Sequence, residues 1–173
     1  TRNEYKKMFG FEKNIVFGHV GAFREQKNQI RLIDIFSEVS HELENAVLIL
    51  VGEAIRQDEI EYMNLVKKKI ELLDLADKVF FLGNRNDIGK LMSMFDGMIF
   101  PSKFEGLPLV LVESQAASLP TIISKDVIPS HVKMTSYIQF ESLKASNTDW
   151  VQKTLLLLKM KRIHTDETLK KKG

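Results

Sequence analysis

Short apolar runs alternate with longer amphipathic stretches along most of this chain. The apolar runs, which we interpret as β-strands, lie at residues 14–20, 46–51, 79–82, 98–100, 121–124 and 137–140. Most of them show no alternation of apolar and polar positions, which is typical of strands buried on both faces of a sheet. The clearest example is the sequence AVLILV, from Ala46 to Val51.

The stretches between these runs have the periodicity of helices. From Asn28, apolar residues recur at spacings of four, three and four, at Leu32, Phe36, Val39 and Leu43. The pattern predicts further helices over 59–73, 88–95 and 149–160, the second of them capped by Asp87. This alternation predicts an α/β fold, a Rossmann-like parallel sheet with helices on both faces.

The composition is ordinary for a globular domain. The chain has 173 residues, of which 44% are hydrophobic and 28% are charged, and its net charge is +2. We treat residues 1–173 as one domain with its own core, because no linker or repeat divides them. The basic residues are scattered and only slightly in excess, so we expect no nucleic-acid partner.

Cysteine is absent, and no apolar run approaches the length of a membrane span. We therefore expect a cytoplasmic protein. The net charge and the basic tail at 170–172 permit peripheral contact with anionic lipid on the inner face of the membrane, although a frayed end is the simpler interpretation of the tail. Because the chain opens with Thr1 rather than Met, we interpret it as a fragment of a longer protein.

Four turns that follow predicted strands are expected to meet at one edge of the sheet, where parallel sheets bind their ligands. The first, residues 21–28, begins with Gly21 and carries Arg24 and Lys27 just before a helix. These cations can neutralise a diphosphate while the amides of the helix N-terminus hold its oxygens. A solvated surface loop is an equally good interpretation of this turn.

The second and third turns are less informative. Gly52 favours a simple end of a strand over a close approach of the backbone to a ligand. Residues 81–87 can present backbone groups to the edge of a nucleobase, or form no more than a turn and a helix cap.

The fourth turn carries two glutamates, Glu105 in the loop after a strand and Glu113 on the following helix. Backbone amides at the predicted helix N-terminus between them favour an anion. Two carboxylates that can bind sugar hydroxyls around an anion site predict a nucleotide-sugar pocket. Glu113 follows the apolar stretch 107–112, so we expect it to be buried and to need a partner such as a ligand hydroxyl. Two solvated carboxylates are the alternative.

The histidines and acidic residues predict no metal site. His19 ends the first strand beside the expected crevice, where a packed core histidine is favoured over one that lines a pocket. His41, His131 and His164 lie in polar surroundings without the spacing of metal ligands.

Taken together, these segments resemble the C-terminal, donor-binding domain of retaining glycosyltransferases of family 4, which have the GT-B fold. The resemblance rests on residues 21–28, 51–52, 81–85, 96, 101–102 and 105–120. Its most specific sign is the pair of glutamates, Glu105 and Glu113, separated by seven residues. The sequences Glu-Gly-Leu-Pro and Gln-Ala-Ala-Ser-Leu-Pro are most similar to those of transferases that build bacterial capsule or exopolysaccharide.

The resemblance implies a role for each matching residue. Glu105 would contact hydroxyls of the donor sugar near the reacting carbon, as the catalytic residue, and Glu113 would bind the ribose. Lys27, in the turn that begins with Gly21, would hold the diphosphate. Arg24 does not match the family pattern, but we expect it to bind the same phosphates in place of the arginine that is missing at Ala22. Backbone amides would come from three further positions, Gly106, Leu107 and Leu109. The nucleobase would lie between Asn84 and Arg85.

The resemblance also implies transfer with retention of configuration, without a metal or another cofactor. The donor would be a nucleotide-sugar, with UDP favoured over GDP as its carrier. The acceptor, a glycan or a lipid-linked sugar, would bind to an N-terminal domain outside this chain, so we expect the chain alone to bind donor without efficient turnover.

Three positions depart from the family pattern. Ala22 replaces an arginine, Pro108 replaces a glycine and removes an N–H, and Ala54 replaces a second glycine. Two other functions stay open at this point: the nucleotide-binding half of a GT-B sugar-nucleotide epimerase, and a catalytically silent Rossmann-like binding module.

Overall fold

The computed structural model describes residues 2–106, 109–127 and 133–160, and its sheet has the predicted architecture. The six strands are β1 (Ile15–Val20), β2 (Ala46–Val51), β3 (Val79–Gly83), β4 (Gly97–Phe100), β5 (Thr121–Ser124) and β6 (Ile138–Glu141). They pair in the order β3-β2-β1-β4-β5-β6, and every pairing is parallel. After β1 the chain adds β2 and β3 on one side of it, and then crosses to add β4, β5 and β6 on the other side. The sheet therefore has a topological switch point between β1 and β4.

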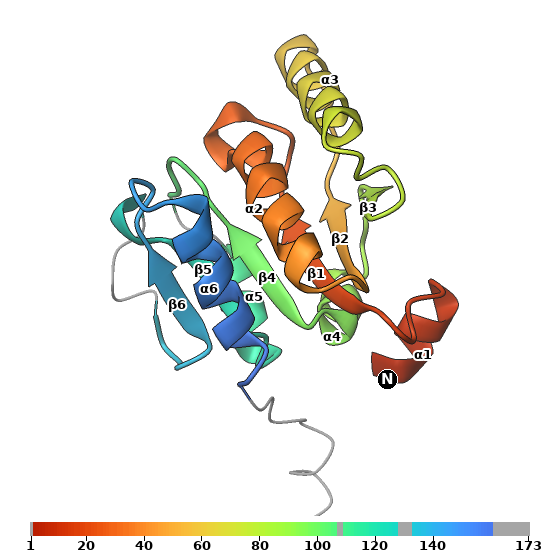
Figure 1. Ribbon diagram of the computed structural model, residues 1–173, viewed down its shortest axis with the longest axis vertical. Helices are drawn as coiled ribbons and strands as arrows, with labels where there is room; N and C mark the ends of the chain where they lie inside the picture. Colours follow the sequence, from red (N-terminus) through yellow and green to blue (C-terminus); the bar gives the residue numbers. More distant parts are fainter. Residues whose placement is uncertain (1, 107–108, 128–132, 161–173) are drawn as a thin grey trace, which may run out of the picture.

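Helices cover both faces of this sheet (Figure 1). One face carries α2 (Gln29–Glu42), α3 (Gln57–Leu72) and α6 (Asn147–Leu157), and the other carries α1 (Arg2–Met8), α4 (Ile88–Met94) and α5 (Leu109–Ala116). Two short 3-10 turns complete the order, η1 (Glu25–Lys27) and η2 (Lys125–Val127). The α/β prediction is confirmed.

Two hydrophobic cores form between the sheet and its helices. All six residues of β2 are buried, as its unbroken apolar sequence predicts, and they alternate between the two cores. Phe17 of β1 packs against Phe36 of α2, and Phe95 fills the space that Gly18 leaves open. Complete burial of one such side chain stabilises the fold by about 2 kcal/mol, so the cores hold the strand ends in fixed positions.

Helix α1 is an element that the sequence pattern does not predict. The Lys6 ammonium donates to Asp96 at 2.9 Å and to the Asn14 carbonyl at 2.7 Å, and Arg2 also pairs with Asp96. The same carboxylate accepts the amide of Val16 at 2.8 Å. Asp96 thus ties α1 to the start of β1.

The prediction that the Asp87 side chain caps α4 is wrong. Asp87 stands at the N-cap position, but its side chain makes no capping hydrogen bond. It accepts instead from Arg85 at 2.9 and 2.8 Å and from the Tyr5 hydroxyl at 3.0 Å.

Among the described residues, no helix combines the length and the apolarity that crossing a membrane requires.

Candidate functional site

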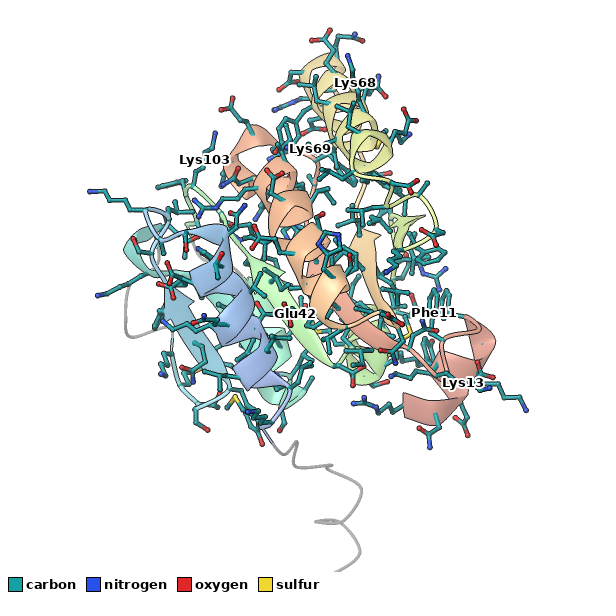
Figure 2. The ribbon with its side chains drawn as sticks, in the orientation of Figure 1. Phe11, Lys13, Glu42, Lys68, Lys69 and Lys103 are labelled. Atoms are coloured by element: carbon teal, nitrogen blue, oxygen red, sulfur yellow. The ribbon has the colours of Figure 1, made fainter. Side chains whose placement is uncertain are left out.

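The carboxyl ends of β1, β2 and β3 enclose a pocket of about 330 Å³. Its walls come from the turns after these strands, and they include Gly21, Arg24, Gly52, Glu53, Asn84 and Arg85. Three of the four predicted turns therefore share one crevice. In Figure 2 the labelled residues Lys68, Lys69 and Lys103 lie at this end of the molecule, and Phe11 and Lys13 lie at the other end.

Gly52 is required where two of these turns meet. Its φ is 142°, and a Cβ at this position would lie 2.1 Å from the carbonyl oxygen of Gly21. The Gly52 amide donates to the Gly83 carbonyl, and the Gly21 amide donates to the Val51 carbonyl, both at 2.8 Å. Gly52 therefore lets one turn pack against another, and it also lines the pocket.

Glu105 and Lys27 form an ion pair behind Gly21. The Lys27 Nζ lies 2.9 Å from both carboxylate oxygens of Glu105, and the Glu105 side chain is 5% exposed. The aliphatic part of Lys27 packs against Gly21, because a Cβ there would lie 3.3 Å from the Lys27 Cε. The two side chains to which the resemblance assigns sugar and phosphate thus neutralise each other.

Hydrogen bonds to backbone carbonyls, two of them donated by side-chain amides, hold together the loops that carry this ion pair. Asn28, in a left-handed conformation with φ 57°, donates to the Pro101 carbonyl at 2.8 Å. Gln26 donates to the Phe104 carbonyl at 2.9 Å, and the Lys103 amide donates to the Gln26 carbonyl at 2.8 Å. Residues 25–28 and 101–105 are therefore held against each other at the switch point between β1 and β4.

His19 is a core residue, as the sequence favoured. Its ring is 1% exposed and lies 4.7 Å from the ring of Phe100. Nδ1 lies 3.0 Å from the Ile99 carbonyl, which can only accept, so Nδ1 carries the proton. Burial, helped by the nearby charge of Lys27, lowers the pKa of His19 to about 4. The imidazole is therefore neutral at neutral pH.

Glu113 is exposed, and the expectation that it is buried is wrong. The positions of α5 that face the protein are Leu111, Ser114 and Gln115. Leu109, at the start of the helix, and Val112 are exposed as well. Since water solvates the Glu113 carboxylate, its charge requires no ligand, and its assigned contact with ribose stays a prediction.

The positions predicted to supply backbone amides lie after β4. Gly106 is exposed, as is Leu109, which begins α5. Leu107, like Pro108, falls outside the described residues. The first amides of an α-helix have no partner within the helix, so α5 offers N–H groups at this end of the sheet.

The sequence analysis missed Glu59, which reaches the pocket from the first turn of α3. Its Oε1 accepts from Arg24 Nε at 2.6 Å, and its Oε2 accepts from the amides of Ile55 and Arg56 at 2.9 and 3.2 Å. The hydrogen bond from the Ile55 amide, followed by those from Arg24 and Arg56, lowers the pKa of Glu59 to about 2. Glu59 is the third residue of α3 and accepts from the backbone amide of Arg56 at the N-cap. Because the N-cap is arginine and not serine or threonine, the sequence carries no capping-box signature.

The remaining predicted residues contact acidic neighbours. Asn84 donates to Glu53 at 3.1 Å, and Arg85 pairs with Asp87. The Arg85 hydrogen bond, with help from Tyr5, lowers the pKa of Asp87 to about 2. Both Asn84 and Arg85 line the pocket, and their contact with a base stays a prediction. Within the described part of the chain, no cluster of histidine and acidic side chains could hold a metal ion.

A family model described as "Glycosyl transferases group 1" matches residues 1–163. EpsF of Bacillus subtilis (strain 168), a glycosyltransferase by name, is 36% identical over 113 residues, which cover 65% of this chain and 28% of EpsF. A UDP-Gal:alpha-D-GlcNAc-diphosphoundecaprenol alpha-1,3-galactosyltransferase of Escherichia coli is 30% identical over 123 residues, 69% of this chain and 30% of the enzyme. The chain thus spans less than a third of either relative.

The fold is similar to that of a solved protein, HepE of Anabaena. The structure of HepE in complex with UDP matches 90% of this chain and 43% of its own, with a TM-score of 0.78 and 24% identity. HepE has also been solved in complex with UDP-glucose. At this identity the likeness shows the fold alone.

Proposed function

The chain belongs to the group 1 glycosyl transferases, and from this premise we propose that it binds a nucleotide-sugar as the donor of glycosyl transfer. The fold is Rossmann-like, and its structural neighbours are GT-B glycosyltransferases. Such enzymes join two domains around a cleft, so residues 1–173 would be the donor half, with the acceptor half elsewhere in a longer protein.

The observation that carries this proposal is the ion pair of Lys27 and Glu105, which lies behind Gly21. Gly21 lines the 330 Å³ pocket, although neither member of the pair does. A diphosphate needs a cation, and sugar hydroxyls need an acceptor such as a carboxylate. The ion pair supplies both at one point, and the hydrogen-bonded loops around it fix their positions. The bond that breaks in glycosyl transfer joins these two parts of the donor.

We assign the remaining contacts around this point. Arg24 shares the diphosphate with Lys27, and the base lies between Asn84 and Arg85. Glu113 binds the ribose, and amides of Gly106, Leu107 and Leu109 face the phosphate and sugar. Glu105, freed from Lys27 by the diphosphate, accepts hydroxyls of the sugar beside the reacting carbon.

The reaction that we propose retains the configuration of the sugar and requires no metal ion. The protein cations and the first amides of α5 stabilise the charge that develops on the departing nucleoside diphosphate, which is electrostatic preorganisation. We propose UDP rather than GDP as the carrier, in line with the UDP bound to HepE. The transferred group is a hexose or a related sugar, and no other cofactor takes part.

The proposed acceptor is a glycan or a lipid-linked sugar in the synthesis of bacterial capsule or exopolysaccharide. The name of the Escherichia coli relative, which acts on a diphosphoundecaprenol-linked sugar, supports this class of acceptor. The proposed location is cytoplasmic, with peripheral contact at the inner face of the membrane through basic residues.

Two substitutions, measured by calorimetric titration, test whether Glu113 contacts the ribose and Glu105 contacts the sugar. Glu113→Ala is expected to weaken binding of both uridine and UDP by about tenfold, because it removes charge-assisted hydrogen bonds to the ribose. Glu105→Gln is expected to weaken UDP-glucose more than UDP. Equal effects of Glu105→Gln on the two ligands would refute its assigned contact with the sugar.

A further inference from the structure

Arg24 stands between two pockets of different character. It lines the 330 Å³ pocket at the strand ends, and it also lines a second pocket of about 430 Å³ between η1 and α3. Three carboxylates line this second pocket, those of Glu25, Asp58 and Glu61. Glu25 and Asp58 already pair with Lys103 and Arg56. A long arginine side chain that is 47% exposed nevertheless has the freedom to turn toward either pocket.

Glu59 holds Arg24 in one position. The Glu59 side chain is 3% exposed, and two backbone amides fix its Oε2. Its Oε1 therefore has a defined place, 2.6 Å from Arg24 Nε. Because the carboxylate is fixed by α3 and the guanidinium is not fixed by its own loop, Glu59 sets the position of Arg24 rather than the reverse.

Arg24 keeps more unbound donors than the other cations near the pocket. Lys27 Nζ binds both oxygens of Glu105, and Arg85 uses Nε and Nη2 on Asp87. Arg24 uses Nε on Glu59, and within the described ranges its two Nη groups make no hydrogen bond. Two parallel N–H groups of this kind suit the oxygens of a phosphate.

We propose that Glu59 is a positioning residue, which holds Arg24 at the strand-end pocket so that its Nη groups bind the diphosphate of the nucleotide. This inference rests on the proposed function. The paired guanidinium attracts a phosphate less than a free one, because the carboxylate offsets its charge. The gain in affinity from a fixed hydrogen-bond geometry therefore has to exceed this loss of attraction. If charge alone mattered, removing the Glu59 carboxylate would strengthen UDP binding, whereas the proposal expects it to weaken UDP binding.

The test is a calorimetric double-mutant cycle with UDP and uridine as ligands. Glu59→Gln is expected to weaken UDP binding by about tenfold and to leave uridine binding unchanged, since only UDP carries the diphosphate. Arg24→Ala is expected to weaken UDP similarly. In the Arg24→Ala background, Glu59→Gln is expected to have no further effect on UDP.

Arg56→Ala is the matched control. Arg56 Nε lies 3.5 Å from the same carboxylate, but its side chain is exposed and lines the second pocket. Its removal is expected to leave UDP affinity unchanged. A purely structural Glu59 would instead weaken uridine and UDP alike, or its effect would add to that of Arg24→Ala; either result would overturn the proposal.

Arg24→Lys keeps the test valid if Glu59→Gln does not fold. It leaves Glu59 and the start of α3 intact and retains the positive charge, but it removes Nε and the parallel Nη groups. UDP affinity is expected to fall nearly as far as in Arg24→Ala, and full retention would refute the proposal. If the unmodified chain binds neither UDP nor GDP, the proposed function itself fails, which is a different result from an additive cycle.

Discussion

The ion pair of Lys27 and Glu105 has unequal partners. Glu105 is almost completely buried, whereas the Lys27 side chain is 18% exposed and long enough to bring its ammonium to water. Removal of the ammonium leaves a buried carboxylate without its partner, but removal of the carboxylate leaves a cation that can move. The fold therefore depends more on a partner for the Glu105 carboxylate than on a partner for the Lys27 ammonium.

Lys27→Met is expected to lower the free energy of unfolding by about 3 kcal/mol, because it leaves Glu105 charged and unpaired. Glu105→Gln, which keeps the shape of the side chain, is expected to cost about 1 kcal/mol. Urea denaturation of both variants measures the difference. Equal losses would contradict the asymmetry of the pair.

His19 gives the chain a dependence of stability on pH. The unfolded chain takes up a proton at His19 below its ordinary pKa of 6.5, whereas the folded chain does so only near pH 4. The contribution is therefore fully present above pH 6.5 and is lost as the pH falls toward 4. We expect the free energy of unfolding to drop by about 2 kcal/mol between pH 7 and pH 5.

Urea titrations at several pH values measure this drop. His19→Gln is expected to abolish it, because glutamine does not titrate. His41→Gln, a change at an exposed histidine, is the control and is expected to retain it. An unchanged slope in His19→Gln would show that other groups cause the effect.

At the scale of elements, local pattern determines the strands and core helices but not how the loops meet. The strands match their predicted ranges within one or two residues, because burial on both faces leaves an unbroken apolar sequence. Helix α1 depends on Asp96, which is 90 positions from Lys6, so no local periodicity predicts it. The contacts between residues 25–28 and 101–105 join positions that are 73 and 78 apart in the sequence, and no local pattern predicts them either.

Glu113 shows that apolar neighbours in the sequence do not suffice to predict that a side chain is buried. The residues before it are mostly apolar, but a helix of eight residues on the outside of the sheet turns only part of its surface inward. Glu59 shows the opposite case. It reads as an ordinary acidic residue of a surface helix, and only the approach of η1 to α3 makes it a pocket residue.

The turns after β1 and β2 give a prediction for these elements. Gly52→Ala is expected to lower the free energy of unfolding by about 2 kcal/mol or more, since the new Cβ would overlap the Gly21 carbonyl at 2.1 Å and the backbone φ of 142° is strained for alanine. Thermal melts measure the loss.

Gly89→Ala is the matched control. It lies inside α4 with open space around it, so alanine is expected to stabilise the chain by up to about 1 kcal/mol. A Gly52→Ala variant as stable as the parent would show that the two turns can separate without cost.

At the scale of the whole molecule, the sheet order places the pocket and the ion pair at one edge. The order β3-β2-β1-β4-β5-β6 brings the ends of β1 and β4 together, and Lys27 and Glu105 follow these two strands. The sequence is sufficient to predict the fold class and three of the turns that line the crevice, but it does not predict that Glu59 also lines it. It does not reveal that Lys27 and Glu105 bind each other.

The central claim, that this chain binds a nucleotide-sugar, is tested most directly by calorimetric titration of the unmodified chain with UDP, GDP and UDP-glucose. We predict binding of one UDP per chain, tighter than that of GDP, with UDP-glucose also bound. The absence of heat with all three ligands at millimolar concentration would contradict the claim.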